Sequence, residues 1–159
     1  MRVGIGYDIH KFGADRPLVL GGVEFPGEPG LIGHSDADPV MHALADAVLG
    51  AAALGDLGDH FPDTSPDWKD ADSARILTEA LRLASKERGL VPVNVDVNVI
   101  AEHPRLAESK HLMRERLARI LGLPIHSVSV KARTAEGLGP VGRGEAIEVQ
   151  AVVLMQEVV

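Results

Sequence analysis

The chain lacks cysteine, long apolar runs and any basic cluster. Without cysteine, neither a disulfide nor a thiolate metal site can form, so any transition metal must be bound by His, Asp or Glu. Apolar stretches such as AVLGAAALG fall well short of the ~20 residues that a membrane-spanning helix needs, and the first residues form no signal-peptide core. We therefore expect a soluble, cytoplasmic protein without a membrane partner.

Positive charge is also scarce. The 16 Lys and Arg residues are outnumbered by 23 Asp and Glu residues, which gives a formal net charge of -7. General attraction to phosphate polymers is disfavoured, so we expect no nucleic acid polymer as a partner. An anionic small-molecule substrate would need local positive charge from metal ions, a few basic residues or backbone N–H groups.

Alternation of apolar and polar residues predicts the strands. Residues 2–10 alternate, which places Asp8 and His10 on one strand face together with Gly4 and Gly6. These glycines carry no side chain and allow another element or a ligand to approach the backbone. A hairpin is predicted around residues 18–25, and further strands at 91–103, 126–133 and 145–158.

Capping residues predict three helices. The first follows the N-cap Asp38 with Pro39 in its first position, the second runs from Asp72 to Gly89, and the third covers residues 106–121. Outside the hairpin, residues 11–38, 55–72 and 134–144 are predicted to be loops. We predict one α/β domain of the α+β type over residues 1–159, with a mixed β-sheet and helices packed on one face. The other face is equally compatible with solvent or with a symmetric oligomer.

Asp8 and His10 are good metal ligands, and either His34 or His42 could complete the set. Two histidines and one carboxylate can hold Zn²⁺ with a fourth position open, as in catalytic zinc sites. The spacing favours His42 because it lies on a helix, where Asp46 one turn later is expected to orient its other ring nitrogen. The alternative is a structural role, in which the Asp and His pair bonds a turn and His42 simply packs.

The glycine-rich segment TAEGLGPVGRGE, residues 134–145, is a second candidate site. Its glycines could cradle a phosphate, Glu136 could bind a hard cation, and Arg143 could contact an anion. The composition alone favours the plainer alternative, a glycine-rich turn between two strands. By composition, FPDTSP at residues 61–66 is likewise an ordinary turn.

Five motifs, in order along nearly the whole chain, carry a family resemblance: GYDIHKF, HSDADPVMHALADAVLGAAALGDLGDHFPDT, KDADS, NVDVNVIAEHPRL and TAEGLGPVGRGE. Together they resemble the 2-C-methyl-D-erythritol 2,4-cyclodiphosphate synthase family. The resemblance implies a phosphorus–oxygen lyase of the non-mevalonate isoprenoid pathway. Such an enzyme converts 4-diphosphocytidyl-2-C-methyl-D-erythritol 2-phosphate to the cyclic diphosphate and releases CMP. It also implies a homotrimer with its sheets facing the threefold axis and active sites at subunit interfaces.

The resemblance further implies roles for individual residues. Zinc would be held by Asp8, His10 and His42, and a second divalent ion, Mg²⁺ or Mn²⁺, by Glu136. The catalytic residues that steady the transition state would be His34 and Thr134. The substrate-binding residues so implied are Asp8, Ile9, His10, His34, Ser35, Asp46, Asp56, Leu57, Gly58, Phe61, Pro62, Asp63, Ala101, Pro104, Arg105, Leu106, Ala132, Arg133, Thr134, Ala135, Glu136 and Arg143.

The chain departs from the family pattern at three positions. Arg133 and Ala135 stand where the family often has threonines, and Pro140 stands where many members have an aromatic residue. Two other functions fit the same metal ligands. One is a zinc phosphohydrolase whose open position activates water, and the other is a non-catalytic, metal-organised trimer that serves as a binding module.

Overall fold

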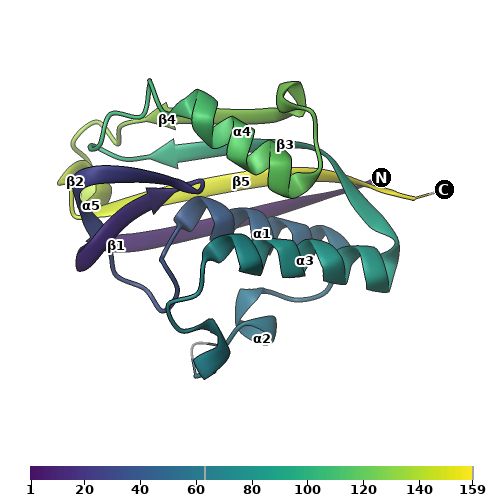
Figure 1. Cartoon of the computed structure of the whole chain (residues 1–159). Helices are drawn as coiled ribbons and strands as arrows, with labels where there is room; N and C mark the ends of the chain where they lie inside the picture. The colour runs from purple at the N-terminus through teal and green to yellow at the C-terminus, as the bar shows by residue number, and fades with distance from the viewer. Residues whose placement is uncertain (63, 159) are drawn as a thin grey trace.

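The computed structural model describes residues 1–62 and 64–158, and a five-stranded mixed sheet runs through them (Figure 1). The strand order is β2-β1-β5-β3-β4, and neighbouring strands are antiparallel except for the parallel pair β3 and β4. The first and last strands of the chain, β1 and β5, are therefore neighbours within the sheet. The strands are β1 (Arg2–Leu20), β2 (Val23–Leu31), β3 (Leu90–Ile100), β4 (Val128–Arg133) and β5 (Ala146–Glu157).

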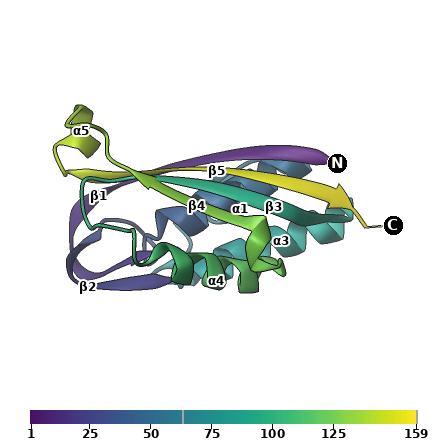
Figure 2. The ribbon, with the colours of Figure 1, turned by 90° about the horizontal axis from the view of Figure 1, so that it is seen from above.

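Three long helices cover one face of this sheet (Figure 2). The helices are α1 (Pro39–Ala52), α2 (Leu57–His60), α3 (Ser73–Arg88), α4 (Lys110–Leu121) and α5 (Gly139–Gly142), with single 3₁₀ turns at Pro66–Trp68 and Ile125–Ser127. The predicted mixed sheet with helices on one face is therefore confirmed. Over the described residues, no helix is both long and apolar enough to cross a membrane.

Helix α1 lies unusually close to β1, because the strand presents glycines to it. A Cβ atom built on Gly4 would lie 1.9 Å from the carbonyl oxygen of Ala47, and one on Gly6 would lie 1.9 Å from that of Ala43. The helix begins where Asp38 accepts hydrogen bonds from the amides of residues 40 and 41, as predicted. This close contact brings the first turn of α1 over the part of β1 that follows Gly6.

Several predicted loops contain regular structure. Strand β1 continues to Leu20 and β2 extends to Leu31, so that only residues 32–38 separate the hairpin from α1. Prolines and glycines in this region had indicated a loop, but β2 is an edge strand and its pairing is irregular around Pro17, which such residues tolerate. The predicted loops 55–72 and 134–144 contain α2 and α5, and the helix predicted from residue 106 begins at Lys110.

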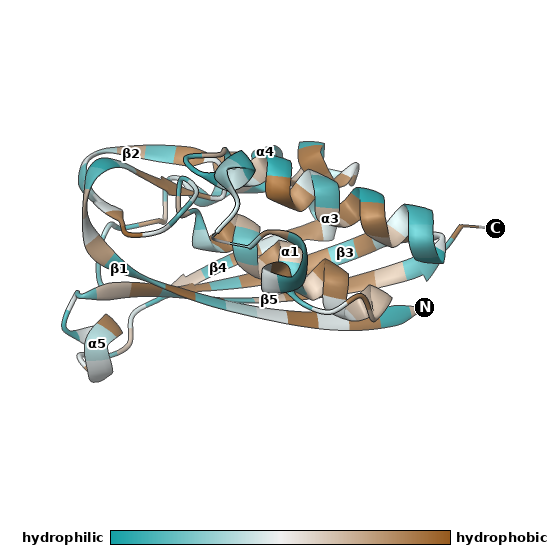
Figure 3. Cartoon of the chain, turned by 90° about the horizontal axis from the view of Figure 1, so that it is seen from below, coloured by the Kyte–Doolittle hydropathy of each residue, from teal (hydrophilic) through white to brown (hydrophobic). Residues whose placement is uncertain are grey.

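The sheet face opposite the helices is partly apolar. Val3 and Ile5 on β1 are 68% and 73% exposed, and apolar bands run along this strand in Figure 3. On β3 the valines face the helices instead, and Val95, Val97 and Val99 are buried there. An apolar stripe on β1 is therefore left uncovered in a single chain.

Candidate active site

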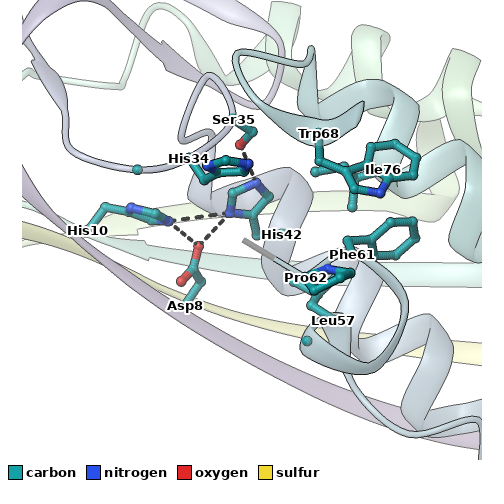
Figure 4. Close-up of a pocket in the computed structure, with 12 residues that line it drawn as sticks. Asp8, His10, His34, Ser35, His42, Leu57, Phe61, Pro62, Trp68 and Ile76 are labelled. Atoms are coloured by element: carbon teal, nitrogen blue, oxygen red, sulfur yellow. Dashed lines mark hydrogen bonds and ion pairs between the residues drawn. The ribbon is translucent and has the colours of Figure 1, made fainter. Parts of the chain in front are cut away.

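Three ligand atoms from β1 and α1 meet beside the first turn of α1 (Figure 4). His10 Nε2 and His42 Nδ1 lie 2.9 and 3.1 Å from Asp8 Oδ2, and the two nitrogens lie 3.3 Å apart. Two ligands of a tetrahedral zinc ion, each about 2.0–2.1 Å from the metal, are roughly 3.3 Å apart. The donor set and its spacing therefore fit a divalent metal ion with an open fourth position.

Hydrogen bonds fix which ring nitrogen of each histidine faces the site. His10 Nδ1 donates to the carbonyl oxygen of Ile32 over 2.7 Å, which leaves Nε2 as a ligand. His42 Nε2 lies 2.9 Å from both Ser35 Oγ and Ser73 Oγ, which leaves Nδ1 toward Asp8. Metal-binding histidines commonly use their second nitrogen in this way, and the bond holds the ring in place.

The prediction that Asp46 orients His42 is wrong. Both ring nitrogens of His42 have other partners, and the Asp46 carboxylate accepts a hydrogen bond from the amide of Leu57 over 3.2 Å. Its place is taken by Ser73 at the start of α3, whose hydroxyl donates to Asp36 Oδ1 and whose amide donates to Asp36 Oδ2. The only signal for Ser73 in the sequence was its place in the KDADS motif.

The pKa values of Asp8 and His10 are both shifted in this site. Burial raises the pKa of Asp8, but hydrogen bonds from His10 and His42 and their positive charge outweigh it and lower this pKa to about 2. Burial lowers the pKa of His10, but the hydrogen bond to Asp8 and its negative charge outweigh burial and raise it. The Asp8 carboxylate therefore favours positive charge on His10, and a divalent cation would take the place of that charge.

A cavity of about 520 Å³ opens beside the ligands. Its polar side carries the three ligands together with His34 and Ser35 (Figure 4). Its other side is apolar, and there the rings of Phe61 and Trp68 pack edge to face with their centroids 4.8 Å apart. His34 Nε2 donates to the carbonyl oxygen of Ser65 over 3.1 Å. The lining residues are Asp8, His10, Gly33, His34, Ser35, His42, Leu57, Gly58, Phe61, Pro62, Trp68 and Ile76, of which Gly33, Trp68 and Ile76 were not predicted.

A second cavity, of about 230 Å³, lies at the ends of β3 and β4. It contains three cationic side chains, Arg105, Lys110 and Arg133, in a chain that is otherwise acidic. Among the residues that the structure describes, none lines both cavities. The lining residues are Ala101, Glu102, Pro104, Arg105, Leu106, Ala107, Lys110, Ala132, Arg133 and Thr134. Of these, Ala107 and Lys110 were not predicted, whereas Glu102 lies within residues 101–106, the stretch that the resemblance implied for the cytidine diphosphate pocket.

The remaining predicted residues that the structure describes line neither cavity. Glu136 accepts a hydrogen bond from the Thr134 hydroxyl over 2.8 Å, and Ala135 donates its amide to Glu102. Arg143 forms an ion pair with Glu145. Two further predicted residues lie apart: Ile9 is exposed on β1, and Asp56 caps α2. The predicted Asp63 falls outside the described residues.

Known proteins resemble the chain over nearly its full length. The family model described as the YgbB family matches residues 1–156. A relative from Chlorobaculum tepidum, named 2-C-methyl-D-erythritol 2,4-cyclodiphosphate synthase, is 54% identical over 156 residues, which cover 98% of this chain and 99% of the relative.

Solved structures share the fold as well. The bifunctional IspDF of Campylobacter jejuni matches 99% of this chain and 42% of its own, with a TM-score of 0.93 and 40% identity. A 2C-methyl-D-erythritol-2,4-cyclodiphosphate synthase in a CDP-bound form matches 98% of this chain and 100% of its own, with a TM-score of 0.88 and 36% identity. The resemblance drawn from the five motifs is confirmed. This chain belongs to the YgbB family, whose members include the 2-C-methyl-D-erythritol 2,4-cyclodiphosphate synthases.

Proposed function

We propose that this chain is a 2-C-methyl-D-erythritol 2,4-cyclodiphosphate synthase, a phosphorus–oxygen lyase of the cytoplasm that acts in the non-mevalonate isoprenoid pathway. Its substrate is 4-diphosphocytidyl-2-C-methyl-D-erythritol 2-phosphate, and its products are the cyclic diphosphate and CMP. The observation that carries the proposal is the convergence of Asp8, His10 and His42 in the wall of a cavity, in a chain of this family.

The reaction is an intramolecular phosphoryl transfer. An oxygen of the 2-phosphate forms a bond to the β-phosphorus of the CDP group, the bond from that phosphorus to the bridging oxygen breaks, and CMP leaves with the electron pair. Two negatively charged phosphates repel each other, so the barrier consists largely of positioning and charge neutralisation. The phosphate nucleophile is already ionised at neutral pH, and no strong general base is required.

The chain offers residues for each of these tasks. Asp8, His10 and His42 would hold zinc, and Glu136 would hold the second divalent ion, Mg²⁺ or Mn²⁺. When bound, these ions supply the positive charge at the phosphate oxygens that an acidic protein lacks. His34 and Thr134 are proposed to steady the transition state. The apolar side of the larger cavity, with Leu57, Phe61 and Trp68, would cover the methylerythritol carbon chain and keep out water.

The smaller cavity is proposed to receive the cytidine diphosphate. Arg105 and Arg133 could contact the diphosphate, and the backbone from residue 101 to residue 106 could contact the base and sugar. A solved relative in a CDP-bound form supports cytidine diphosphate as the ligand class. Arginine can grip a phosphate with two parallel hydrogen bonds, so Arg133 is compatible with the same role as the hydroxyl residue it replaces.

We also propose a homotrimer whose sheets face the threefold axis, with active sites between subunits. Two observations support it. The apolar stripe of Val3, Ile5 and Tyr7 on the open sheet face is 53–73% exposed in one chain, which is typical of a surface that packs against a partner. The two predicted halves of the site line separate cavities, and a neighbouring subunit could bring them together.

A product assay tests the activity. The protein, loaded with Zn²⁺ and Mg²⁺, is incubated with the CDP-methylerythritol phosphate, and the products are identified by ³¹P NMR. We expect equimolar CMP and cyclic diphosphate. Ring-opened phosphate products would instead identify a zinc phosphohydrolase, and no turnover by a zinc-loaded trimer would identify a binding module.

Subunit mixing tests the location of the site. His42→Ala and Glu136→Ala proteins, each inactive alone, are unfolded together and refolded as a mixture. If each site takes His42 from one subunit and Glu136 from another, about a quarter of the sites in a random mixture contain both residues. Activity near that fraction supports the interface site, whereas an inactive mixture of correctly assembled trimers contradicts it.

A further inference from the structure

Arg16 on β1 donates hydrogen bonds to three alternate backbone carbonyls of one loop. Its Nε donates to the carbonyl oxygen of Leu31 over 3.0 Å, its Nη2 to that of Gly33 and its Nη1 to that of Ser35. The side chain is partly buried, and among the described residues no carboxylate forms an ion pair with it. The guanidinium group is therefore used on backbone dipoles and not on an opposite charge.

The loop depends on these bonds for its shape. Residues 31–35 join the end of β2 to the segment that leads into α1. We call them the ligand loop, because two of them hold the rings of His10 and His42. Its other two carbonyls, those of Ile32 and His34, accept from His10 Nδ1 at 2.7 Å and from the amide of Asp70 at 2.8 Å. All five carbonyls thus have partners, and Arg16 supplies three of them. Removing it would leave three polar groups without a protein partner.

The ligand loop carries groups of the candidate active site. Its Ile32 carbonyl fixes the ring of His10, and its Ser35 hydroxyl lies 2.9 Å from His42 Nε2. His34 projects from the same loop into the larger cavity (Figure 4). Arg16 itself does not line that cavity. Apart from its positive charge, which acts on His10 through space, Arg16 can affect metal or substrate only through the loop.

The local backbone places the guanidinium within reach of the loop. The pairing of β1 with β2 is irregular between Ala14 and Pro17, and bulges of this kind redirect side chains. On the facing strand, a Cβ atom on Gly30 would lie 2.3 Å from the Arg16 carbonyl oxygen, so only glycine lets β2 pass so closely. Lysine could not replace the arginine, because its single ammonium group lacks the planar, five-donor fork.

We propose that Arg16 is a positioning residue that holds the ligand loop in the geometry required by His34, His10 and His42. Its effect on turnover rests on the proposed function, whereas its effect on the loop does not. Hydrogen exchange of the metal-free protein measures the second effect directly. The variants are Arg16→Ala and Arg16→Lys, and the matched control is Arg2→Ala, an exposed arginine on the same strand.

In both Arg16 variants we expect faster exchange at the amides of residues 32–38, with little change in β3, β5 and α3, and no local change in Arg2→Ala.

The kinetic effect is measured with zinc and magnesium bound. We expect kcat to fall by about 10²-fold, because small misplacements of catalytic groups reduce turnover by such factors. The KM should change less than kcat, because the second cavity, proposed to receive the cytidine diphosphate, contains no residue of this loop. Zinc affinity should fall by about tenfold. Guanidinium ions at low millimolar concentration should partly restore loop protection and kcat in Arg16→Ala alone.

Three results would overturn the proposal: wild-type protection of residues 32–38 in Arg16→Ala, a rise in exchange spread evenly over the whole chain, or full recovery by lysine. The first denies the constraint, the second indicates general stability only, and the third indicates that charge alone matters. If the wild-type chain shows no turnover, the proposed function fails, but the exchange experiment still decides the role of Arg16.

Discussion

Gly6 lies directly against the carbonyl oxygen of Ala43, which a Cβ atom at Gly6 would approach to 1.9 Å. This contact joins β1 to α1 next to the site, because Gly6 is two residues before Asp8 on the strand and Ala43 directly follows His42 on the helix. The separation of the two elements therefore sets the 3.1 Å distance between Asp8 Oδ2 and His42 Nδ1. Gly6 belongs to the construction of the site, although it has no side chain.

Replacing Gly6 by alanine should weaken both folding and metal binding. The added methyl group must push α1 away from β1, and overpacking of this kind costs about 1–3 kcal/mol of unfolding free energy. Urea unfolding measures the loss, and zinc titration against a chelator measures the affinity. Gly50→Ala is the control, because its Cβ would meet only the Ile5 carbonyl at 3.9 Å. Alanine in a helix should stabilise that variant by about 0.5–1 kcal/mol; equal effects of both substitutions would contradict this account.

His42→Ala should lose zinc and activity but remain a trimer. The substitution removes one of three ligands, while the exposed stripe on β1 proposed as the subunit contact lies on the opposite face of the sheet. Metal analysis after dialysis and sedimentation velocity check the two parts separately. His111→Ala is the control, since its side chain is 70% exposed on α4. A variant with stoichiometric zinc and full activity would refute the ligand assignment.

The sequence predicted the metal ligands because each followed from a local rule. Alternation over residues 2–10 put Asp8 and His10 on one face of β1, and the Asp38 cap with Pro39 placed His42 in the first turn of α1. Ser73 could not be found in this way. It lies 31 residues from His42, and only the packing of α3 against α1 brings it within reach of the ring.

Other errors came from local signals that tertiary structure overrode. Gly13, Pro17 and Pro29 indicated a loop, but edge pairing and bulges absorb them in β1 and β2. Helix α2 has only four residues, held by a reciprocal capping box between Asp56 and Asp59, and is too short to show periodicity. The same limit hid Arg16, whose three acceptors are backbone carbonyls that no sequence pattern displays.

Ser73→Ala should loosen His42 without removing a metal ligand. The hydroxyl is fully buried between His42 Nε2 and Asp36, so its loss leaves His42 Nε2 with Ser35 as its one remaining partner. It also removes one of the two hydrogen bonds to Asp36 Oδ1, the other coming from the Asp38 amide. Second-layer substitutions of this kind lower metal affinity by about 10–100-fold. Ser85→Ala, on an exposed position of α3, is the matched control.

A double substitution sharpens that test. Ser35 and Ser73 contact the same ring nitrogen and lie 3.1 Å from each other. The effects of Ser35→Ala and Ser73→Ala on zinc affinity should therefore not add, because residues that share a partner are coupled. Strict additivity in the double-mutant cycle would show that the two hydroxyls act independently of the His42 ring.

The pH dependence of metal-free stability should carry the signature of the Asp8 and His10 pair. The folded-state pKa of Asp8 is lowered from 3.8 to about 2, so its contribution is present above pH ~4 and is lost as the pH falls toward 2. The pKa of His10 is raised above 6.5, so its contribution is complete below that value and is lost as the pH rises through the folded-state pKa. The pair should stabilise the chain most between about pH 4 and 6.5.

Urea unfolding in the presence of a chelator, at intervals from pH 3 to 9, checks this window by comparison with Asp8→Asn. The shift of Asp8 to about 2 corresponds to roughly 2 kcal/mol, which is the expected maximum difference between the two proteins. The difference should shrink on both sides of the window, because one partner loses its charge on each side. A difference that stays constant across this range would mean that Asp8 contributes through neutral hydrogen bonds, and that the charge of His10 does not stabilise it.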